Sequence, residues 1–364
     1  MQEDAPLEAP SRRKRRAFFV AAINPALVSV SLLAVAVPAE FVLRQRYAHM
    51  IRTPRAEVMA VQQYLTLDPV IGFKWRPDIS AERGIRFSIN DMTTPALSTD
   101  SFGVINAPDA IALRAAGRPI DVVGLGDSFM EMAAAPFHDR FKKLGLAYYS
   151  LAIHRQCPPQ YGAILKSWAA ELKPRAVLYG LFENDFEETA DYGSWRSSGV
   201  DWFAYHSGTW CGPPIGVSAI DRFLHTHARG WNAFGRVLLS KVRGERISVS
   251  GPADRDMADV TASIRDAAAW ADAAGVRFIL VIIPSKQTAA GSDTRESRAY
   301  DAVLAALGNR SIEVVDLRAA FRSHPDPASL YYVVDGHWNA AGVALAGDEI
   351  LKRFEGAANE SGSH

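Results

Sequence analysis

Hydrophobic and polar positions follow two different patterns, which meet near residue 118. Residues 40–117 show no long helical periodicity and contain only short strand-like segments punctuated by glycine, such as 68–75. Beyond this point, short unbroken apolar runs alternate with stretches whose apolar residues recur every three or four positions. The pattern predicts a β-rich lead-in over 40–117, followed by an α/β domain over 118–355.

The α/β domain is predicted to contain five strands, each made of an apolar run. These runs lie at 120–125, 147–153, 176–182, 278–283 and 312–317. Helical spacing is found at 158–172, 257–271, 300–307 and after Asn339. Continuous hydrophobicity within each strand is typical of a parallel sheet that is covered on both faces. We therefore expect a three-layer α/β/α sandwich with a mostly parallel five-stranded sheet, and a polar, disordered tail at 356–364.

A charge-free apolar stretch, residues 17–37, follows five consecutive cations at 12–16. Its length matches the roughly 20 residues that a helix needs to cross a bilayer. The positive-inside rule then gives a cytoplasmic basic tail at 1–16, a transmembrane signal anchor at 17–39 and an extracytoplasmic remainder, periplasmic if the source is bacterial. Cleavage of a signal peptide near Ala39 is the alternative.

Composition indicates which partners and cofactors are not expected for this chain. Forty acidic and forty basic residues cancel, so no overall field steers the protein toward nucleic acid. The two cysteines, Cys157 and Cys211, either pair in an oxidising compartment or remain thiols. No cysteine or histidine spacing suggests zinc, and neither a metal nor another cofactor is predicted.

Residues with catalytic chemistry follow the predicted strands. Ser128 comes directly after the first strand, Asn184 after the third, and Asp335 and His337 lie before the last helix. Active sites of parallel α/β sheets lie at the carboxyl ends of the strands, where these residues meet. His337 would accept the proton of Ser128 while Asp335 orients its imidazole. The backbone N–H of Ser128 and the amide of Asn184 are suited to binding an oxyanion.

These blocks resemble the SGNH/GDSL hydrolase family over roughly residues 118–355. The resemblance implies a flavodoxin-like sheet, Ser128 as nucleophile, Asp335 and His337 as the rest of a triad, and Asn184 in the oxyanion hole. The family's other oxyanion donor, the backbone N–H of a glycine, aligns with Arg155. The Asp-x-His-Trp pattern is similar to the motif of alginate O-acetyltransferases, in which it precedes the serine.

The chain departs from the family pattern at three places. Arg155 replaces the glycine of the oxyanion block. If the backbone there needs a positive φ, which glycine adopts readily, Arg155 must adopt it instead. Glu183 adds a carboxylate directly before Asn184, and Phe182 replaces a glycine two residues before it. The late block reads Asp-x-His, where the family more commonly has Asp-x-x-His. His154 and Arg155 are also candidates for binding an anionic group.

An insertion at 186–251 interrupts the sheet pattern and holds four of the eight tryptophans. One interpretation is a lid or a substrate platform beside the site, whose flat aromatic faces suit sugar rings. The other is a local apolar cluster that packs the insertion onto the domain. The sequence leaves both open.

The resemblance and the predicted anchor together imply a membrane-anchored, extracytoplasmic serine esterase or O-acyltransferase. Its expected substrate is an ester group, with O-acetyl preferred, on a cell-surface glycan. A polytopic membrane acyltransferase is a possible partner that supplies the acyl group. The alternative is a catalytically inactive SGNH-fold protein that binds glycan or assists such an acyltransferase.

Overall fold

The computed structural model describes residues 64–80, 88–89, 92–93, 97–206, 254–292, 294–308, 312–333 and 336–360, with six isolated residues between 27 and 38. Within these ranges, no helix combines the length and the apolar character that crossing a membrane requires. The anchor predicted at 17–39 lies almost entirely outside them, as do Asp335 and Cys211. The elements from residue 64 onward belong to one compact unit, formed by residues 53–218 and 248–364.

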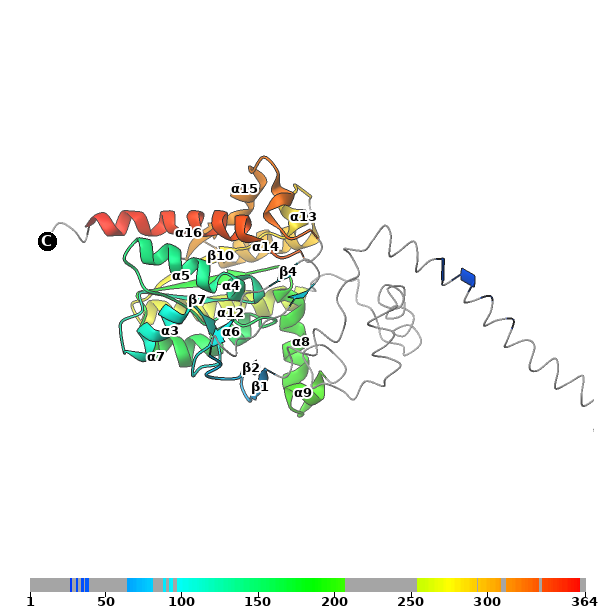
Figure 1. Ribbon diagram of the computed structural model, residues 1–364, viewed down its shortest axis with the longest axis horizontal. Coiled ribbons are helices and arrows are strands. Elements are labelled where there is room, and N and C mark those ends of the chain that lie inside the picture. Colours follow the sequence, from blue (N-terminus) through cyan, green and yellow to red (C-terminus); the bar gives the residue numbers. More distant parts are fainter. Residues whose placement is uncertain are drawn as a thin grey trace, which may run out of the picture. The chain divides into compact units, whose positions relative to one another are not determined.

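A five-stranded parallel sheet forms the centre of this unit, as predicted (Figure 1). Its strands are β7 (Val122–Leu125), β8 (Tyr148–Ser150), β9 (Ala176–Leu181), β10 (Arg277–Ile282) and β11 (Glu313–Asp316). Their spatial order is β11-β10-β9-β7-β8. The chain therefore winds outward in both directions from β7 and β9, and the switch between the two directions lies between these strands. Open α/β sheets bind ligands at the carboxyl edge of such a point.

Helices cover both faces of the sheet because successive strand residues point to opposite sides. One face packs on α6 (Pro158–Ile164), α12 (Asp254–Ala273) and α14 (Arg295–Leu307). The other packs on α5 (Ala134–Lys143), α15 (Leu317–Arg322) and α16 (Ala340–Glu360). Within β7, Val123 joins the first core and Val122 the second. The expected three layers are present (Figure 1).

The predicted helices are found with changed ends. The helix expected at 158–172 continues from α6 through a π-helical turn, η2 (Leu165–Ala169), into α7 (Ala170–Leu172). The last helix, α16, extends to Glu360 and includes residues 356–360 of the predicted tail. Elements that the pattern did not predict include α5, α15, α13 (Lys286–Ala289) and η4 (Pro327–Leu330), whereas α4 (Ser128–Met132) is the helix expected to begin at Ser128.

The described part of the lead-in contains three antiparallel strand pairs and one helix. The pairs are β1 (Leu65–Asp68) with β2 (Gly72–Trp75), β3 (Ser88–Ile89) with β4 (Met92–Thr93), and β5 (Ser98–Thr99) with β6 (Ile105–Asn106). The helix, α3 (Pro108–Ala115), is too short to show the periodicity that would have predicted it. The β-rich character is as expected.

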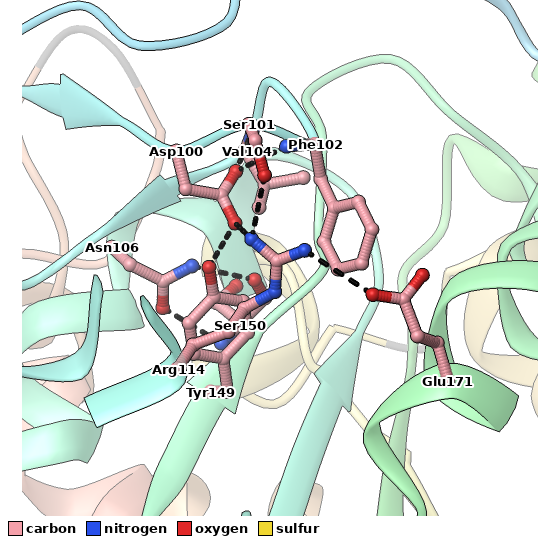
Figure 2. A network of polar contacts seen from close by, with 9 residues as sticks. All are labelled: Asp100, Ser101, Phe102, Val104, Asn106, Arg114, Tyr149, Ser150 and Glu171. Carbon is pink, nitrogen blue, oxygen red and sulfur yellow. Dashed lines mark hydrogen bonds and ion pairs between the residues drawn. The ribbon is translucent and has the colours of Figure 1, made fainter. Parts of the chain in front are cut away.

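A buried polar network joins the lead-in to β8 (Figure 2). Asp100 accepts hydrogen bonds from the Tyr149 hydroxyl and from Arg114, the latter at 3.0 Å. Asn106 exchanges two 2.8 Å hydrogen bonds with the backbone of Ser150, as donor to its carbonyl and acceptor from its N–H. Because these groups are buried, replacing either partner alone leaves the other unsatisfied. The lead-in is therefore an integral part of the domain.

The described part of the insertion contains α8 (Asp185–Ser198) and α9 (Trp202–Tyr205). Trp195 and Trp202 are only 5% and 2% exposed and pack in the same core as the lead-in. For these two tryptophans, the structure favours the apolar packing cluster over a sugar platform. Trp210 and Trp231 lie outside the described residues. Cys157 is a buried free thiol that donates to Gln160 Oε1 at 3.1 Å.

Candidate active site

The strand register brings three distant segments to one edge of the sheet. Beyond β8, the N–H of Ile153 donates to the carbonyl of Gly126 at 3.2 Å, so residues 154–155 lie beside 127–128. On the other side of β7, Leu125 pairs with Tyr179, which places residues 182–184 beside the same turn. The sequence-predicted blocks around Ser128, Arg155 and Asn184 therefore converge at the switch point of the sheet.

A tight turn presents Ser128 at the start of α4. Asp127 caps this helix, with its carboxylate accepting the N–H of Phe129 at 3.0 Å. The turn requires glycine at position 126, where φ is +153° and a Cβ would lie 2.4 Å from Met130 Cγ. The Ser128 hydroxyl is thereby fixed just beyond the carboxyl end of β7.

Ser128 and His337 are in contact, although 209 positions separate them in the sequence. Ser128 Oγ lies 2.8 Å from His337 Nε2. When this nitrogen carries no proton, the hydroxyl donates to it, which is the arrangement that activates a serine. The fold thus brings together the two residues that the sequence analysis paired as nucleophile and base. Asp335, the third member of that prediction, lies outside the described residues.

Two residues of the chain hold the His337 loop in place. Trp338 is fully buried, and its indole N–H donates to the carbonyl of Phe129 in α4 at 3.2 Å. Lys286 in α13 donates to the carbonyls of Tyr332 and Val333 at 3.0 and 3.1 Å. The tryptophan of the Asp-x-His-Trp pattern therefore links the histidine loop to the serine helix. No sequence signal pointed to Lys286.

Arg155 has the backbone conformation of a glycine. Its φ is +56°, in the left-handed region, so the substitution has not removed the conformation that the sequence analysis put in question. Its guanidinium Nε lies 3.7 Å from Glu188 Oε1, and the Arg155 side chain is 31% exposed. The side chain is held toward α8, away from the Ser128 turn on which the sequence analysis placed the role of the Arg155 backbone N–H.

Asn184 begins α8 but does not cap it with its side chain. The side chain instead lies near the carboxyl groups of Asp127 and Glu188 and lowers the pKa of each, although burial of the two carboxyl groups has the larger, raising effect. The next residue, Asp185, is buried and closes the turn by accepting the N–H of Phe182 at 2.8 Å and the Tyr161 hydroxyl at 2.7 Å. Asn184 is therefore fixed beside the Ser128 turn with an amide that can donate hydrogen bonds.

Buried carboxyl groups surround this amide, and burial keeps them protonated to unusually high pH. Burial raises the pKa of Asp127 to about 6, against the lowering effect of the Phe129 N–H. Burial raises the pKa of Glu188 to about 8, although the Arg155 charge lowers it. Burial also raises the pKa of Asp185 well above its usual value. Protonation removes negative charge from the place where an oxyanion would form. Glu188, four residues after Asn184 on one helix face, was not singled out from the sequence.

The raised pKa of Glu188 predicts that stability falls with increasing pH. Between about 4.5 and 8, the folded state holds a proton that the unfolded state has lost, so the free energy of unfolding decreases through this window. Glu188→Gln, which stays uncharged, should match the wild type near about pH 5 and exceed it near about pH 9. The expected difference is on the order of a few kcal/mol, measurable by urea unfolding at each pH.

Glu187→Gln is the matched control, because Glu187 lies on the same helix but is exposed. It should leave the pH dependence unchanged. Equal stability of wild type and Glu188→Gln at high pH would contradict the buried, protonated state of Glu188.

Comparison with known families gives a match in the C-terminal part of the chain, which carries His337. Residues 244–362, which include His337, match the family model described as an SGNH hydrolase-like domain of acetyltransferase AlgX. No curated protein matches the chain significantly.

Solved structures with similarity include a GDSL-like lipase from Bacteroides thetaiotaomicron, 15% identical, with a TM-score of 0.40 over 68% of this chain and 97% of that chain. A lipase/acylhydrolase from Enterococcus faecalis is 13% identical, with a TM-score of 0.37 over 65% and 97%. A mutant acetyl-xylooligosaccharide esterase from Geobacillus Stearmophilus is 12% identical, with a TM-score of 0.40 over 65% and 94%. Similarity at this level does not by itself establish activity or substrate.

The segment that matches the family model is only one part of the α/β domain. The matched segment supplies β10, β11 and the His337 loop, while the preceding part supplies β7 and Ser128. The contact between Ser128 and His337 joins the two parts. Residues 244–362 are therefore similar to the SGNH hydrolase-like domain of acetyltransferase AlgX, and they fold together with the preceding α/β segment that carries Ser128.

Proposed function

We propose that the protein is a serine esterase or O-acyltransferase in which Ser128 is the nucleophile and His337 its base. The observation that carries the proposal is the 2.8 Å separation between Ser128 Oγ and His337 Nε2. A serine hydroxyl is a weak nucleophile until a neighbouring base accepts its proton, and this distance lets it do so. Asp335 would orient the imidazole and stabilise its charged form.

The reaction would proceed through an acyl-enzyme. Ser128 Oγ forms a bond to the ester carbonyl carbon while its proton passes to His337 Nε2. The resulting oxyanion accepts hydrogen bonds from the backbone N–H groups of Ser128 and Arg155 and from the amide of Asn184. Collapse breaks the ester C–O bond, and His337 returns the proton to the leaving alcohol. Water or a sugar hydroxyl then accepts the acyl group by the reverse sequence of steps.

The proposed substrate class is an O-acyl, preferably O-acetyl, group on a cell-surface glycan. Two observations support it: the matched family is described as an acetyltransferase, and the basic run at 12–16 precedes a charge-free stretch of anchor length. In this proposal the N-terminus is cytoplasmic and the catalytic domain extracytoplasmic. A polytopic membrane acyltransferase would be the partner that delivers the acyl group.

Covalent labelling tests the nucleophile directly. A fluorophosphonate should react with the full-length wild type, with formation of the Ser128 Oγ–P bond and release of fluoride. Ser128→Ala should not be labelled, whereas Ser323→Ala, which changes a serine bonded only to the nearby Ala320 carbonyl, should react normally. A folded wild type that is not labelled would contradict the proposal and favour an inactive, glycan-binding protein.

A further inference from the structure

A buried acid–imidazole pair lies next to the proposed site but outside its proton relay. Glu131 is three residues after Ser128 in α4, and His154 directly precedes Arg155. His154 Nδ1 lies 3.2 and 3.3 Å from the two carboxylate oxygens of Glu131. Each residue is only 6% exposed. The pair therefore cross-links the helix that carries the nucleophile to the segment that carries the second backbone donor.

The lead-in supplies the third partner of this pair. The indole N–H of Trp75, at the end of β2, donates to Glu131 Oε1 at 2.5 Å. The rings of Phe73 and Trp75 lie 5.2 and 4.7 Å from the His154 ring. Both aromatic residues are at most 1% exposed. A strand of the lead-in thus contacts both members of the acid–imidazole pair.

Side-chain amides hold the rest of the same segment to the lead-in backbone. Gln156 donates to the carbonyl of Phe73 at 3.0 Å, and Gln160 donates to the carbonyl of Ile71 at 2.7 Å. Both glutamines are fully buried. Residues 154–160 are therefore attached to β2 and the turn before it by three separate side chains.

This attachment explains how Arg155 keeps a left-handed backbone. A residue other than glycine adopts φ near +56° only where its surroundings over-determine that conformation. The flanking residues His154 and Gln156 are both fixed by groups of the lead-in or α4. The orientation of the Arg155 N–H is then set by the lead-in as well as by the sheet.

We propose that Trp75, Glu131 and His154 form a positioning triad that fixes the Arg155 N–H relative to Ser128, so that the lead-in is a working part of the catalytic unit. The inference rests on the proposed function of Ser128 and Arg155. It also gives His154 a role other than the anion-binding one considered from the sequence, because the Nδ1 of its buried ring faces Glu131.

The triad should affect the chemical step more than binding. Trp75→Phe keeps a large ring but removes the N–H donor, and Glu131→Gln keeps the shape of the side chain but removes its charge. Each is expected to slow the maximal rate of fluorophosphonate labelling roughly 10- to 100-fold, because small misplacement of a catalytic donor has effects of this size. The concentration for half-maximal rate should stay within about twofold. The double variant should be no slower than the slower single variant.

Tyr149→Phe is the matched control, because it removes another buried hydrogen bond between the lead-in and the domain, the one to Asp100 (Figure 2). It should lower the melting temperature without slowing the labelling of folded protein. Equal slowing in Tyr149→Phe, or wild-type labelling rates in folded Trp75→Phe, would overturn the inference while leaving the proposed function intact. A wild type that is not labelled would remove the proposed function and this inference with it.

Discussion

Replacement of His337 by alanine is expected to lower kcat for an ester substrate by roughly 10⁴- to 10⁶-fold, with a much smaller change in KM. Without a base 2.8 Å from its hydroxyl, Ser128 must lose its proton to solvent, and the leaving alcohol has no acid to protonate it. Substrate binding does not require the imidazole, so the loss should fall on the chemical steps. Steady-state kinetics with an aryl acetate measures both constants.

His324→Ala is the control for this change, because His324 is half-buried and its ring hydrogen-bonds the nearby backbone of Asp326. Its kcat should equal that of the wild type. Residues that act as a unit are not additive, so Ser128→Ala combined with His337→Ala should be no slower than Ser128→Ala alone. A His337→Ala enzyme that retains a tenth of wild-type kcat would show that another group activates the serine.

The arrangement of the sheet could be predicted from the sequence because each strand carries its own local signal. The run at 278–283 is apolar throughout and that at 120–125 is mostly apolar, and they end at Pro284 and Gly126. Such runs fit a sheet buried on both faces, and residues at their carboxyl ends necessarily share one edge. That rule placed Ser128 in the right region. The contact between Ser128 and His337 could be seen only in the structure, because no local sequence pattern determines where a loop 209 positions away will lie.

The residues that hold the proposed site in place could not be predicted from local sequence patterns. Trp75, Glu131 and His154 come from three segments, and each residue type is ordinary in its own local context. The left-handed conformation of Arg155 contradicts its local preference and follows from tertiary contacts. Glu188 is one of several acidic residues on α8, and only burial distinguishes it from Glu187. Sequence patterns report local preference, whereas these roles depend on long-range packing.

The departures from the family pattern now have a structural context. Arg155 preserves the backbone of the glycine it replaces and directs its charge toward Glu188. Glu183 is half-buried, and its charge contributes to raising the pKa of Tyr331, after the larger effect of burial. Asp127 and Glu188, two acidic residues near Asn184, both have raised pKa values. An acid-rich sequence is therefore compatible with a site that must stabilise negative charge.

Removal of the Asn184 amide is expected to lower kcat by roughly 10²- to 10³-fold, the usual effect of losing one oxyanion donor. The amide already lies beside Asp127, the residue before the nucleophile, and no capping bond occupies it. Below about pH 6, the carboxyl groups that it faces are largely protonated, so a developing oxyanion would be its strongest acceptor. Asn184→Ala should therefore change kcat far more than KM.

A comparison of two substitutions separates this role from a structural one. Asn184→Asp keeps the size of the side chain but places a fourth carboxyl group among Asp127, Asp185 and Glu188, so it should be slower than Asn184→Ala and lose further activity as pH rises. Asn106→Ala removes a different buried asparagine, one that holds only the Ser150 backbone, and should lower stability without lowering the kcat of folded enzyme. If Asn184→Ala and Asn106→Ala reduce kcat equally, Asn184 serves the fold and the oxyanion is stabilised by backbone N–H groups alone.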